Sequence, residues 1–374
     1  MAKLLSNPYL DSPISAKRIL LMTLSAITFI SEVIYGTIRG FIWFGIGRET
    51  KNESKFNLFH EMICNFMKLN CNIHPWISCE IKNPYNESFK NGAIAVCNHQ
   101  SLIDTLCLLI LSPKILIAAN RKVIYNPIVR ILLHYAEFVC VDKRIDYLID
   151  YCDRQTKRGY TVVFFPEGLR SKHCDIRRFH TGAFYIANKL KIDILPLYLH
   201  GTGYFLPFGK AFQNNVAMSI EIGKRIRPNL NSFDVREQTR MMRSHYNKHY
   251  DKICRETEKT CFFKQFVISL FETINKGRET KRILAKYDNF SQWIDCDFKI
   301  DNIYIEDRTN GVFTLMFALV HPNTYISTTN NTDLESIYKG RKNLPRNISF
   351  KKEKSFLSND KYYEINNMVI IYKI

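Results

Sequence analysis

The sequence lacks the motifs that would explain its positive charge by nucleic-acid binding. Its 374 residues include 53 Lys and Arg but only 35 Asp and Glu, for a net charge of +18. A field of this sign attracts nucleic acids, phosphorylated metabolites or anionic lipid surfaces. No zinc-finger spacing, RNP-like aromatic motif or bZIP basic region accompanies the basic residues, so we expect no nucleic-acid partner. An anionic membrane surface or a phosphorylated ligand is favoured.

The 11 cysteines include no C-x-x-C pair, and no group of Cys and His residues has the spacing of metal ligands. Cys97, Cys107 and Cys140 lie within apolar runs, where cysteine behaves as a small hydrophobic residue. The sequence therefore predicts neither a metal site nor a bound cofactor. Scattered cysteines also favour a reducing, cytosol-facing compartment.

The most apolar stretch, residues 19–47, is interrupted only by Glu32 and Arg39. It is long enough for a transmembrane helix, but Glu32 argues against a clean span. No small-residue cleavage pattern follows, so a secretory signal is not expected. We expect two short helices that lie in or dip into one leaflet of a membrane, on its cytoplasmic face. A true span and a buried helix of a soluble protein are the alternatives.

Short apolar runs alternate with helical patterns from about residue 77 to residue 250. The alternation predicts an α/β fold with a largely parallel or mixed sheet whose strands are buried on both faces. A charged helical stretch and a second, smaller strand and helix pattern follow. We predict membrane-associated helices over residues 1–60, an α/β domain over 61–250 and a small α/β domain over 255–374.

A histidine and an aspartate follow the predicted strand over residues 93–97. On one continuous helix, His99 and Asp104 would point about 140° apart, because each residue turns by about 100°. If His99 lies in a turn before a helix that starts near Ser101, Asp104 can reach the imidazole. A histidine held in this way suits a general base that takes a proton from a hydroxyl. The alternative is a capping box with Ser101 as N-cap and His99 as an ordinary loop residue.

Another predicted strand, over residues 160–164, ends in the sequence Phe-Pro-Glu-Gly at 165–168. Pro and Gly favour a tight turn, which would present backbone N–H groups and the Glu167 carboxylate at the end of the sheet. The basic residues that follow suit a phosphate, although a solvated charged loop is the alternative. These residues are Arg170, Lys172, Arg177 and Arg178.

Lys143 and Arg144 follow a further predicted strand. Cations at a strand end can hold a phosphate, but a surface run of charge explains them equally well.

In order and spacing, four segments resemble the sequence blocks of the glycerolipid acyltransferase family typified by bacterial 1-acyl-glycerol-3-phosphate acyltransferase (PlsC-like). Residues 98–104 match its H-x-x-x-x-D block, and residues 165–171 match its F-P-E-G-T-R-S block. Residues 141–144 resemble a block that ends in arginine, and residues 194–197 resemble its last, proline-containing strand. The resemblance extends over roughly residues 15–230.

The resemblance implies an O-acyltransferase of phospholipid synthesis. A fatty acyl group would move from a thioester co-substrate, acyl-CoA or acyl-carrier protein, to a lysophospholipid such as 1-acyl-glycerol-3-phosphate, without a covalent acyl-enzyme. His99 matches the general base and Asp104 the residue that orients it, so both are candidate catalytic residues. The candidate substrate-binding residues are Lys143, Arg144, Glu167, Gly168, Arg170 and Pro196.

The sequence departs from the family pattern near the expected phosphate contacts. Leu169 replaces a threonine, and residues 179–182 read Phe-His-Thr-Gly where the family has F-K-K-G. These changes leave His99 and Asp104 intact, so they bear on the acceptor more than on the reaction. A lyso-aminolipid acceptor is therefore an alternative to a lysophospholipid. The same residues also leave open a thioesterase and a catalytically silent membrane-binding protein.

The C-terminal region faintly resembles a methyltransferase-like nucleotide fold. Its first strand is expected over residues 302–306, but the turn that follows has only Gly311 where such a fold is glycine-rich. Thr328 and Thr329 stand where an acidic ribose ligand is expected. We therefore expect a degenerate methyltransferase-like scaffold or a docking module.

Overall fold

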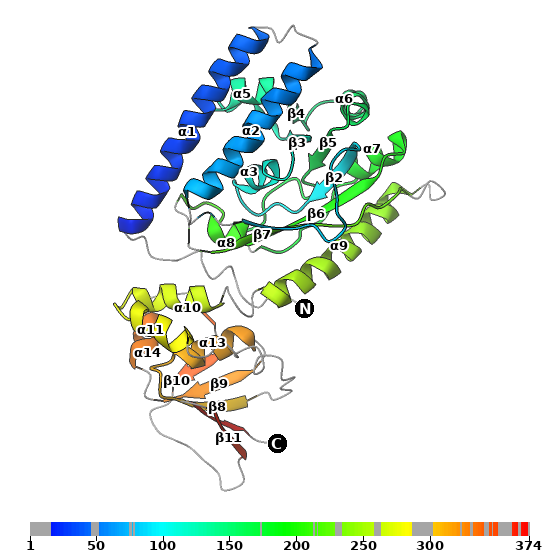
Figure 1. Cartoon of the computed structure of the whole chain (residues 1–374). Helices are drawn as coiled ribbons and strands as arrows, with labels where there is room; N and C mark the ends of the chain where they lie inside the picture. The colour runs from blue at the N-terminus through cyan, green and yellow to red at the C-terminus, as the bar shows by residue number, and fades with distance from the viewer. Residues whose placement is uncertain are drawn as a thin grey trace. The chain divides into compact units, whose positions relative to one another are not determined.

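The computed structural model divides the chain into two compact units, one of residues 15–251 and one that includes residues 252–374 (Figure 1). The described residues are 16–45, 52–74, 77, 79–172, 174–211, 214, 216–228, 234–257, 263–285, 302–321, 324–329, 332–339, 344–345, 347–350, 361–365 and 368–372.

A mixed seven-stranded sheet forms the centre of the first unit. Its order is β1-β7-β6-β2-β5-β3-β4, and the five strands from β6 to β4 are parallel to one another. β7 runs antiparallel to β6, and β1 runs parallel to β7. The strands are β1 (Cys79–Lys82), β2 (Ala93–Cys97), β3 (Ile115–Ala119), β4 (Val139–Cys140), β5 (Thr161–Phe164), β6 (Ile194–His200) and β7 (Met218–Ile222).

Helices cover both faces of this sheet. Every residue of β2, β5 and β6 is buried, as expected for central strands whose sequences are continuous apolar runs. The α/β architecture with a mixed sheet is thus confirmed. The helices are α1 (Ala16–Phe44), α2 (Glu53–Ile73), α3 (Asp104–Leu109), α4 (Arg121–Ile124), α5 (Arg130–Tyr135), α6 (Ile145–Lys157), α7 (Gly182–Leu190), α8 (Thr202–Phe205) and α9 (Val235–Thr257).

The N-terminal apolar stretch forms one continuous helix, α1, so the prediction of two short helices within residues 19–47 is wrong. No proline interrupts the stretch, and its glycines mark close packing instead of a break. A Cβ atom at Gly40 would lie only 2.2 Å from the Tyr135 ring, and one at Gly36 would lie 2.8 Å from Leu132. The two glycines therefore let α5 approach the backbone of α1 closely.

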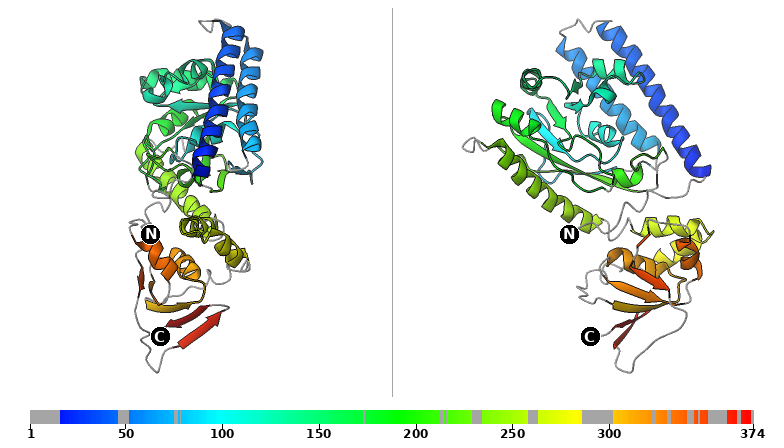
Figure 2. Two further views of the ribbon diagram at one scale, coloured as in Figure 1. Left: turned by 90° about the vertical axis from the view of Figure 1, so that its left-hand side faces the viewer. Right: turned by 180° about the vertical axis from the view of Figure 1, so that it is seen from behind.

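α1 packs along α2 and α5 (Figures 1 and 2). The apolar side chains that it does not bury against these helices form an exposed row. Its one carboxylate faces α2, where Asn70 Nδ2 donates to Glu32 Oε1 over 2.6 Å. Among the described residues, α1 is the one helix whose length and composition would allow it to cross a membrane. The exposed large apolar residues of α1 include Ile19, Leu20, Leu24, Ile27, Ile30, Ile34, Ile38, Phe41 and Ile42.

The second unit contains a five-stranded sheet of order β10-β9-β8-β12-β11, in which β8, β9 and β10 are parallel. β12 lies antiparallel to both β8 and β11. Its strands are β8 (Asn302–Asp307), β9 (Tyr325–Thr328), β10 (Ile348–Phe350), β11 (Lys361–Ile365) and β12 (Met368–Tyr372). Its helices are α10 (Phe263–Glu272), α11 (Gly277–Ala285), α13 (Val312–Val320) and α14 (Thr332–Tyr338).

The turn between β8 and α13 is closed by a buried carboxylate. Asp307 accepts hydrogen bonds from the backbone N–H groups of Thr309 and Thr314, both over 2.7 Å. The negative side chain thus occupies the start of α13, the position where a nucleotide fold receives an anionic ligand. The methyltransferase-like resemblance stays a prediction.

Candidate active site

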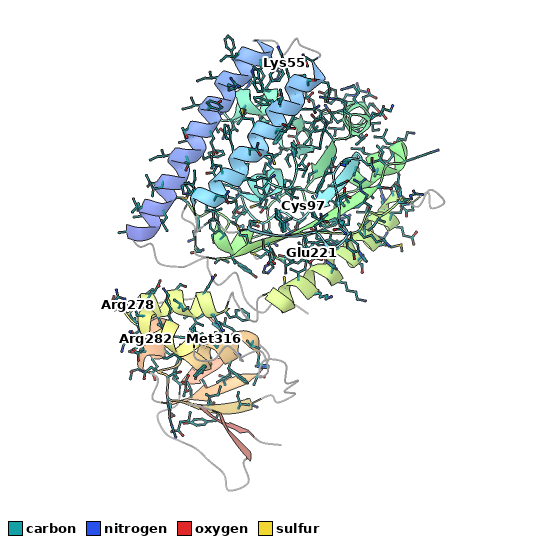
Figure 3. The ribbon with its side chains drawn as sticks, viewed as in Figure 1. Lys55, Cys97, Glu221, Arg278, Arg282 and Met316 are labelled. Atoms are coloured by element: carbon teal, nitrogen blue, oxygen red, sulfur yellow. The ribbon has the colours of Figure 1, made fainter. Side chains whose placement is uncertain are left out.

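The carboxyl ends of β2 and β5 place two loops side by side at one edge of the main sheet. The strands are parallel neighbours, with Val96 paired to Phe164. The loop after β2 carries His99, and the loop after β5 carries Glu167. In Figure 3 the label Cys97 marks the last residue of β2. Residues far apart in the sequence therefore meet at the point where the sheet ends.

His99 and Asp104 form a direct pair. The His99 Nδ1–H donates to Asp104 Oδ2 over 2.8 Å. Asp104 is fully buried, whereas 20% of the His99 side chain remains exposed. The tautomer that donates from Nδ1 leaves Nε2 as the basic atom. The expected histidine held by a carboxylate is present, with the ring accessible on one side.

The turn between the two residues is organised by the same carboxylate. Asp104 Oδ2 also accepts from the backbone N–H groups of Gln100 (2.7 Å) and Ser101 (2.8 Å). α3 begins at Asp104, three residues later than expected. Ser101 is not its N-cap, since the Ser101 hydroxyl donates to the Leu206 carbonyl over 2.9 Å. The capping-box interpretation of this segment is therefore wrong.

Glu167 lies beneath the histidine loop and is 3% exposed. Its Oε1 accepts from the backbone N–H of His99 over 2.8 Å, and its Oε2 accepts from the N–H of Arg177 over 2.7 Å. Burial raises the pKa of Glu167 to about 7, against the lowering effect of these two backbone donors. The negative charge of Asp104 adds to the increase in pKa. Both carboxylate oxygens are used for structure.

The turn after β5 holds the histidine backbone from a second direction. The N–H of Ser171 donates to the His99 carbonyl over 2.8 Å, and the Phe165 ring stacks on the imidazole with 4.2 Å between centroids. Gly168 has a φ of +70°, and a Cβ there would lie 3.2 Å from the His180 ring. The turn therefore requires glycine at this position.

α9 anchors the two residues that flank His99. The Asn98 backbone N–H donates to Tyr246 Oη over 2.9 Å, and Gln100 Nε2 donates to Tyr250 Oη over 2.6 Å. The Asn98 side chain also pairs with both the N–H and the carbonyl of Leu199 on β6, each over 2.8 Å. Sequence reasoning missed these supports, because they come from a helix about 150 residues away along the chain.

The sequence of the domain that carries this site is similar to those of known acyltransferases. Residues 77–200 match the family model described as Acyltransferase. The chloroplastic 1-acyl-sn-glycerol-3-phosphate acyltransferase of Arabidopsis thaliana is 31% identical over 157 residues, which are 40% of this chain and 44% of that protein. The 1-acyl-sn-glycerol-3-phosphate acyltransferase beta of Homo sapiens is 22% identical over 38% of this chain and 54% of that protein. The matched segment thus spans about half the length of each relative.

The crystal structure of PlsC, the 1-acyl-sn-glycerophosphate acyltransferase of Thermotoga maritima, has the same fold. It superimposes with a TM-score of 0.54 at 20% identity, over 63% of this chain and 96% of that chain. The first unit thus has the PlsC fold, and residues 77–200 match the Acyltransferase family. The expected resemblance is thereby confirmed in sequence and in fold.

Two of the other candidate residues, Lys143 and Arg144, lie apart from the histidine. Lys143 and Arg144 follow β4, three strands from β2 at the same sheet edge, or roughly 14 Å away. Arg144 is 89% exposed and pairs only loosely with Asp146, over 3.5 Å. These two cations belong to the same edge as His99 but do not contact it.

Arg170 and Pro196 have different surroundings. The Arg170 guanidinium lies over the Phe208 ring, 5.0 Å from its centroid. Arg170 belongs to the loop after β5, in which Ser171 binds the His99 carbonyl. Pro196 is buried within β6, where it pairs with Val96 of β2. Arg170 therefore lies in the active-site loop, whereas Pro196 is part of the sheet that supports it.

Two basic residues at this edge were missed by sequence reasoning. Arg121 and Lys122 begin α4 directly after β3, and the backbone N–H of Arg121 donates to Asp142 Oδ2 over 2.8 Å. The signal was present in the sequence, because basic residues directly follow an apolar strand just as Lys143 does.

The described residues contain no group of three His, Cys, Asp or Glu side chains placed to hold a metal ion.

Proposed function

We propose that this protein is an O-acyltransferase that moves a fatty acyl group from a thioester to the free hydroxyl of 1-acyl-glycerol-3-phosphate. The His99–Asp104 pair at the carboxyl end of β2 carries the proposal. A buried carboxylate orients an accessible imidazole there, and nothing in membrane binding alone requires that arrangement. The acceptor is taken from the similar 1-acyl-sn-glycerol-3-phosphate acyltransferases.

The mechanism needs one general base. His99 Nε2 takes the proton of the acceptor hydroxyl as its oxygen attacks the thioester carbonyl, forming a tetrahedral intermediate. The intermediate collapses, the C–S bond breaks, and the proton on His99 passes to the departing thiolate. Asp104 stabilises the imidazolium that exists between these steps. The products are the ester and a free thiol, and the enzyme returns to its starting state.

The acceptor phosphate is proposed to bind the cations along the same edge of the sheet. Arg170 lies in the loop after β5, Arg121 and Lys122 follow β3, and Lys143 and Arg144 follow β4. Arg and Lys side chains bind phosphate through charge-assisted hydrogen bonds. With the phosphate on these side chains, the glycerol hydroxyl is directed along the edge toward His99.

The acyl chain and the acceptor both reside in membranes, which gives the apolar side of α1 a role. Its row of exposed apolar side chains and the net charge of +18 suit the cytoplasmic face of an anionic bilayer. We propose that α1 and α2 dock the domain there. Lipid substrates then reach the sheet edge without crossing water.

The deciding experiment measures thiol release from a panel of acyl-CoA and acyl-carrier-protein donors. Each donor is tested with lysophosphatidate, with a lyso-aminolipid and without acceptor, using wild type, His99→Ala and the control His245→Ala. His245 is an exposed histidine on α9. We expect release that depends on lysophosphatidate, is lost in His99→Ala and persists in His245→Ala.

Each remaining outcome would indicate a different function. Release without any acceptor would indicate a thioesterase, and release with the aminolipid alone would change the acceptor. No release with any donor, together with intact vesicle binding, would indicate a membrane-binding protein without catalytic activity.

A further inference from the structure

A strongly basic pocket of about 680 Å³ lies between the start of α7 and the first turns of α9. This volume is within the range of small-molecule sites, which is about 300–1,000 Å³. Its lining includes Arg178, His180, Thr181, Arg236, Arg240 and Arg243. No Asp or Glu side chain lines it, so the pocket suits an anion with more than one negative charge.

Three of the four guanidinium groups make no ion pair or hydrogen bond with the described residues, although Asp234 and Glu237 lie on the same segment as two of them. The three are Arg178, Arg236 and Arg240, and all are exposed to solvent. Unpaired arginines that converge on a concavity repel one another, which a bound anion would relieve. The pocket therefore has charge that the rest of the described fold does not use.

The fourth arginine ties the pocket to the loop beneath His99. Arg243 Nε donates to the Arg177 carbonyl over 2.8 Å, and the Arg177 N–H donates to Glu167. The other Glu167 oxygen accepts from the His99 N–H, so the Arg177 and His99 nitrogens lie within about 8 Å of each other along this chain of bonds. Arg178, which lines the pocket, therefore directly follows Arg177, which binds Glu167 beneath the histidine loop.

We propose that this pocket binds the phosphates of a nucleotide-linked acyl donor, the 3′-phosphate and diphosphate of a coenzyme A thioester. The inference rests on the proposed acyl transfer, because it identifies the carrier used in that reaction. A single phosphomonoester would leave much of the arginine charge unpaired, whereas coenzyme A brings three phosphate groups. No side chain caps the start of α7, so its first backbone N–H groups add donors of the same kind.

The separation between the pocket and His99 fits such a donor. About thirteen bonds separate the sulfur of coenzyme A from its diphosphate. At the length per bond of an extended peptide chain, they span roughly 15 Å. Arg178 follows Arg177 directly, so the pocket begins within that reach of the imidazole. A carrier protein would instead need an open basic surface, because its acidic helix is too wide for a pocket of this size.

The test is isothermal titration of coenzyme A into the full chain in detergent, in the absence of acceptor. The pocket variant is Arg236→Gln/Arg240→Gln, and the control is Lys189→Gln/Lys248→Gln, which removes two exposed charges from the same two helices. We expect the pocket variant to bind at least about 10-fold more weakly and the control within about 2-fold of wild type. Wild type should bind dephospho-coenzyme A more weakly than coenzyme A, and the pocket variant should not distinguish them.

Three results would overturn the inference. The first is unchanged coenzyme A binding in the pocket variant and in a milder single variant, Arg178→Gln. The second is a selective loss of lysophosphatidate affinity, and the third is a selective loss of affinity for acyl-carrier protein. Because binding is measured without turnover, the coenzyme A titration can be interpreted even if the protein does not transfer acyl groups. Conversely, if acyl transfer depends on His99 but the pocket variant binds coenzyme A as wild type does, only the proposal for the pocket is rejected.

Discussion

The backbone N–H of His99 donates a hydrogen bond to the buried carboxylate of Glu167, 2.8 Å away. The proposed base and the turn after β5 are therefore one structural unit. Glu167 has both oxygens engaged by backbone donors, so its contribution is to position the histidine loop, and the proposed phosphate contact is left to the basic residues of the same sheet edge. This separates the role of the glutamate from that of its basic neighbours.

Replacing Asp104 with Asn should lower kcat by about 10²- to 10⁴-fold with little change in KM. The amide loses the negative charge that stabilises the imidazolium and favours the wrong tautomer of His99. Steady-state kinetics of acyl transfer would show it, with circular dichroism as a check of the fold. A variant that keeps more than half of the wild-type kcat would show that Asp104 merely closes the turn.

Glu167 should make the stability of the first unit depend on pH. Its pKa of about 7 lies above the ordinary value of 4.5, so the contribution of its protonated form is fully present below about pH 4.5. That contribution is lost as the pH rises through 7. The free energy of unfolding of wild type should fall by about 3 kcal/mol relative to Glu167→Gln between pH 4.5 and 8. Urea titrations at several pH values measure this difference, and parallel curves for the two proteins would contradict it.

Lys143→Gln/Arg144→Gln should raise KM for lysophosphatidate about 10-fold and leave the rate with an uncharged lysolipid acceptor nearly unchanged. Both side chains are exposed at the sheet edge, and their side-chain contacts with α6 are loose: Lys143 Nζ lies 5.9 Å from the centre of the Tyr147 ring, and Arg144 lies 3.5 Å from Asp146. Phosphate binding should therefore suffer much more than stability. The matched control is Lys189→Gln/Lys248→Gln. Equal losses with charged and uncharged acceptors would refute a phosphate contact.

Ile27→Glu/Ile34→Glu should release the protein from anionic vesicles. The two side chains lie on the exposed side of α1, and a charge at either position opposes burial in lipid by about 2–3 kcal/mol. Vesicle sedimentation should show most of the variant in the supernatant. Met241→Glu, which alters an exposed apolar residue on α9, should stay with the pellet. Sedimentation of both variants with the vesicles would exclude α1 from the docking surface.

The sequence predicted the parts of the site that depend on local order along the chain. His99 and Asp104 are five residues apart, so one turn decides whether they meet, and the strand before them could be recognised by its apolar run. Glu167 could be placed because parallel strands bring their carboxyl ends to one edge.

The remaining features depend on packing that no local pattern contains. Tyr246 and Tyr250 reach the histidine loop from α9. Three of the four arginines of the basic pocket, Arg236, Arg240 and Arg243, lie in the same helix, whose sequence reads as an ordinary charged face. The continuity of α1 was also missed, since Glu32 argued against one long helix, whereas in the structure its carboxylate is bound by Asn70 of α2. Helix contacts decided each of these outcomes.

The hydrogen bond from Asn70 to Glu32 bears on the proposed contact of the N-terminal helices with lipid. With its one carboxylate satisfied by α2, α1 has a single rotational setting in which no ionised oxygen faces hydrocarbon. The two helices therefore behave as one rigid pair with a single apolar face. Selection acting on lipid contact would have to change both helices together, and a variant at Asn70 should disturb the orientation of the whole domain at a bilayer.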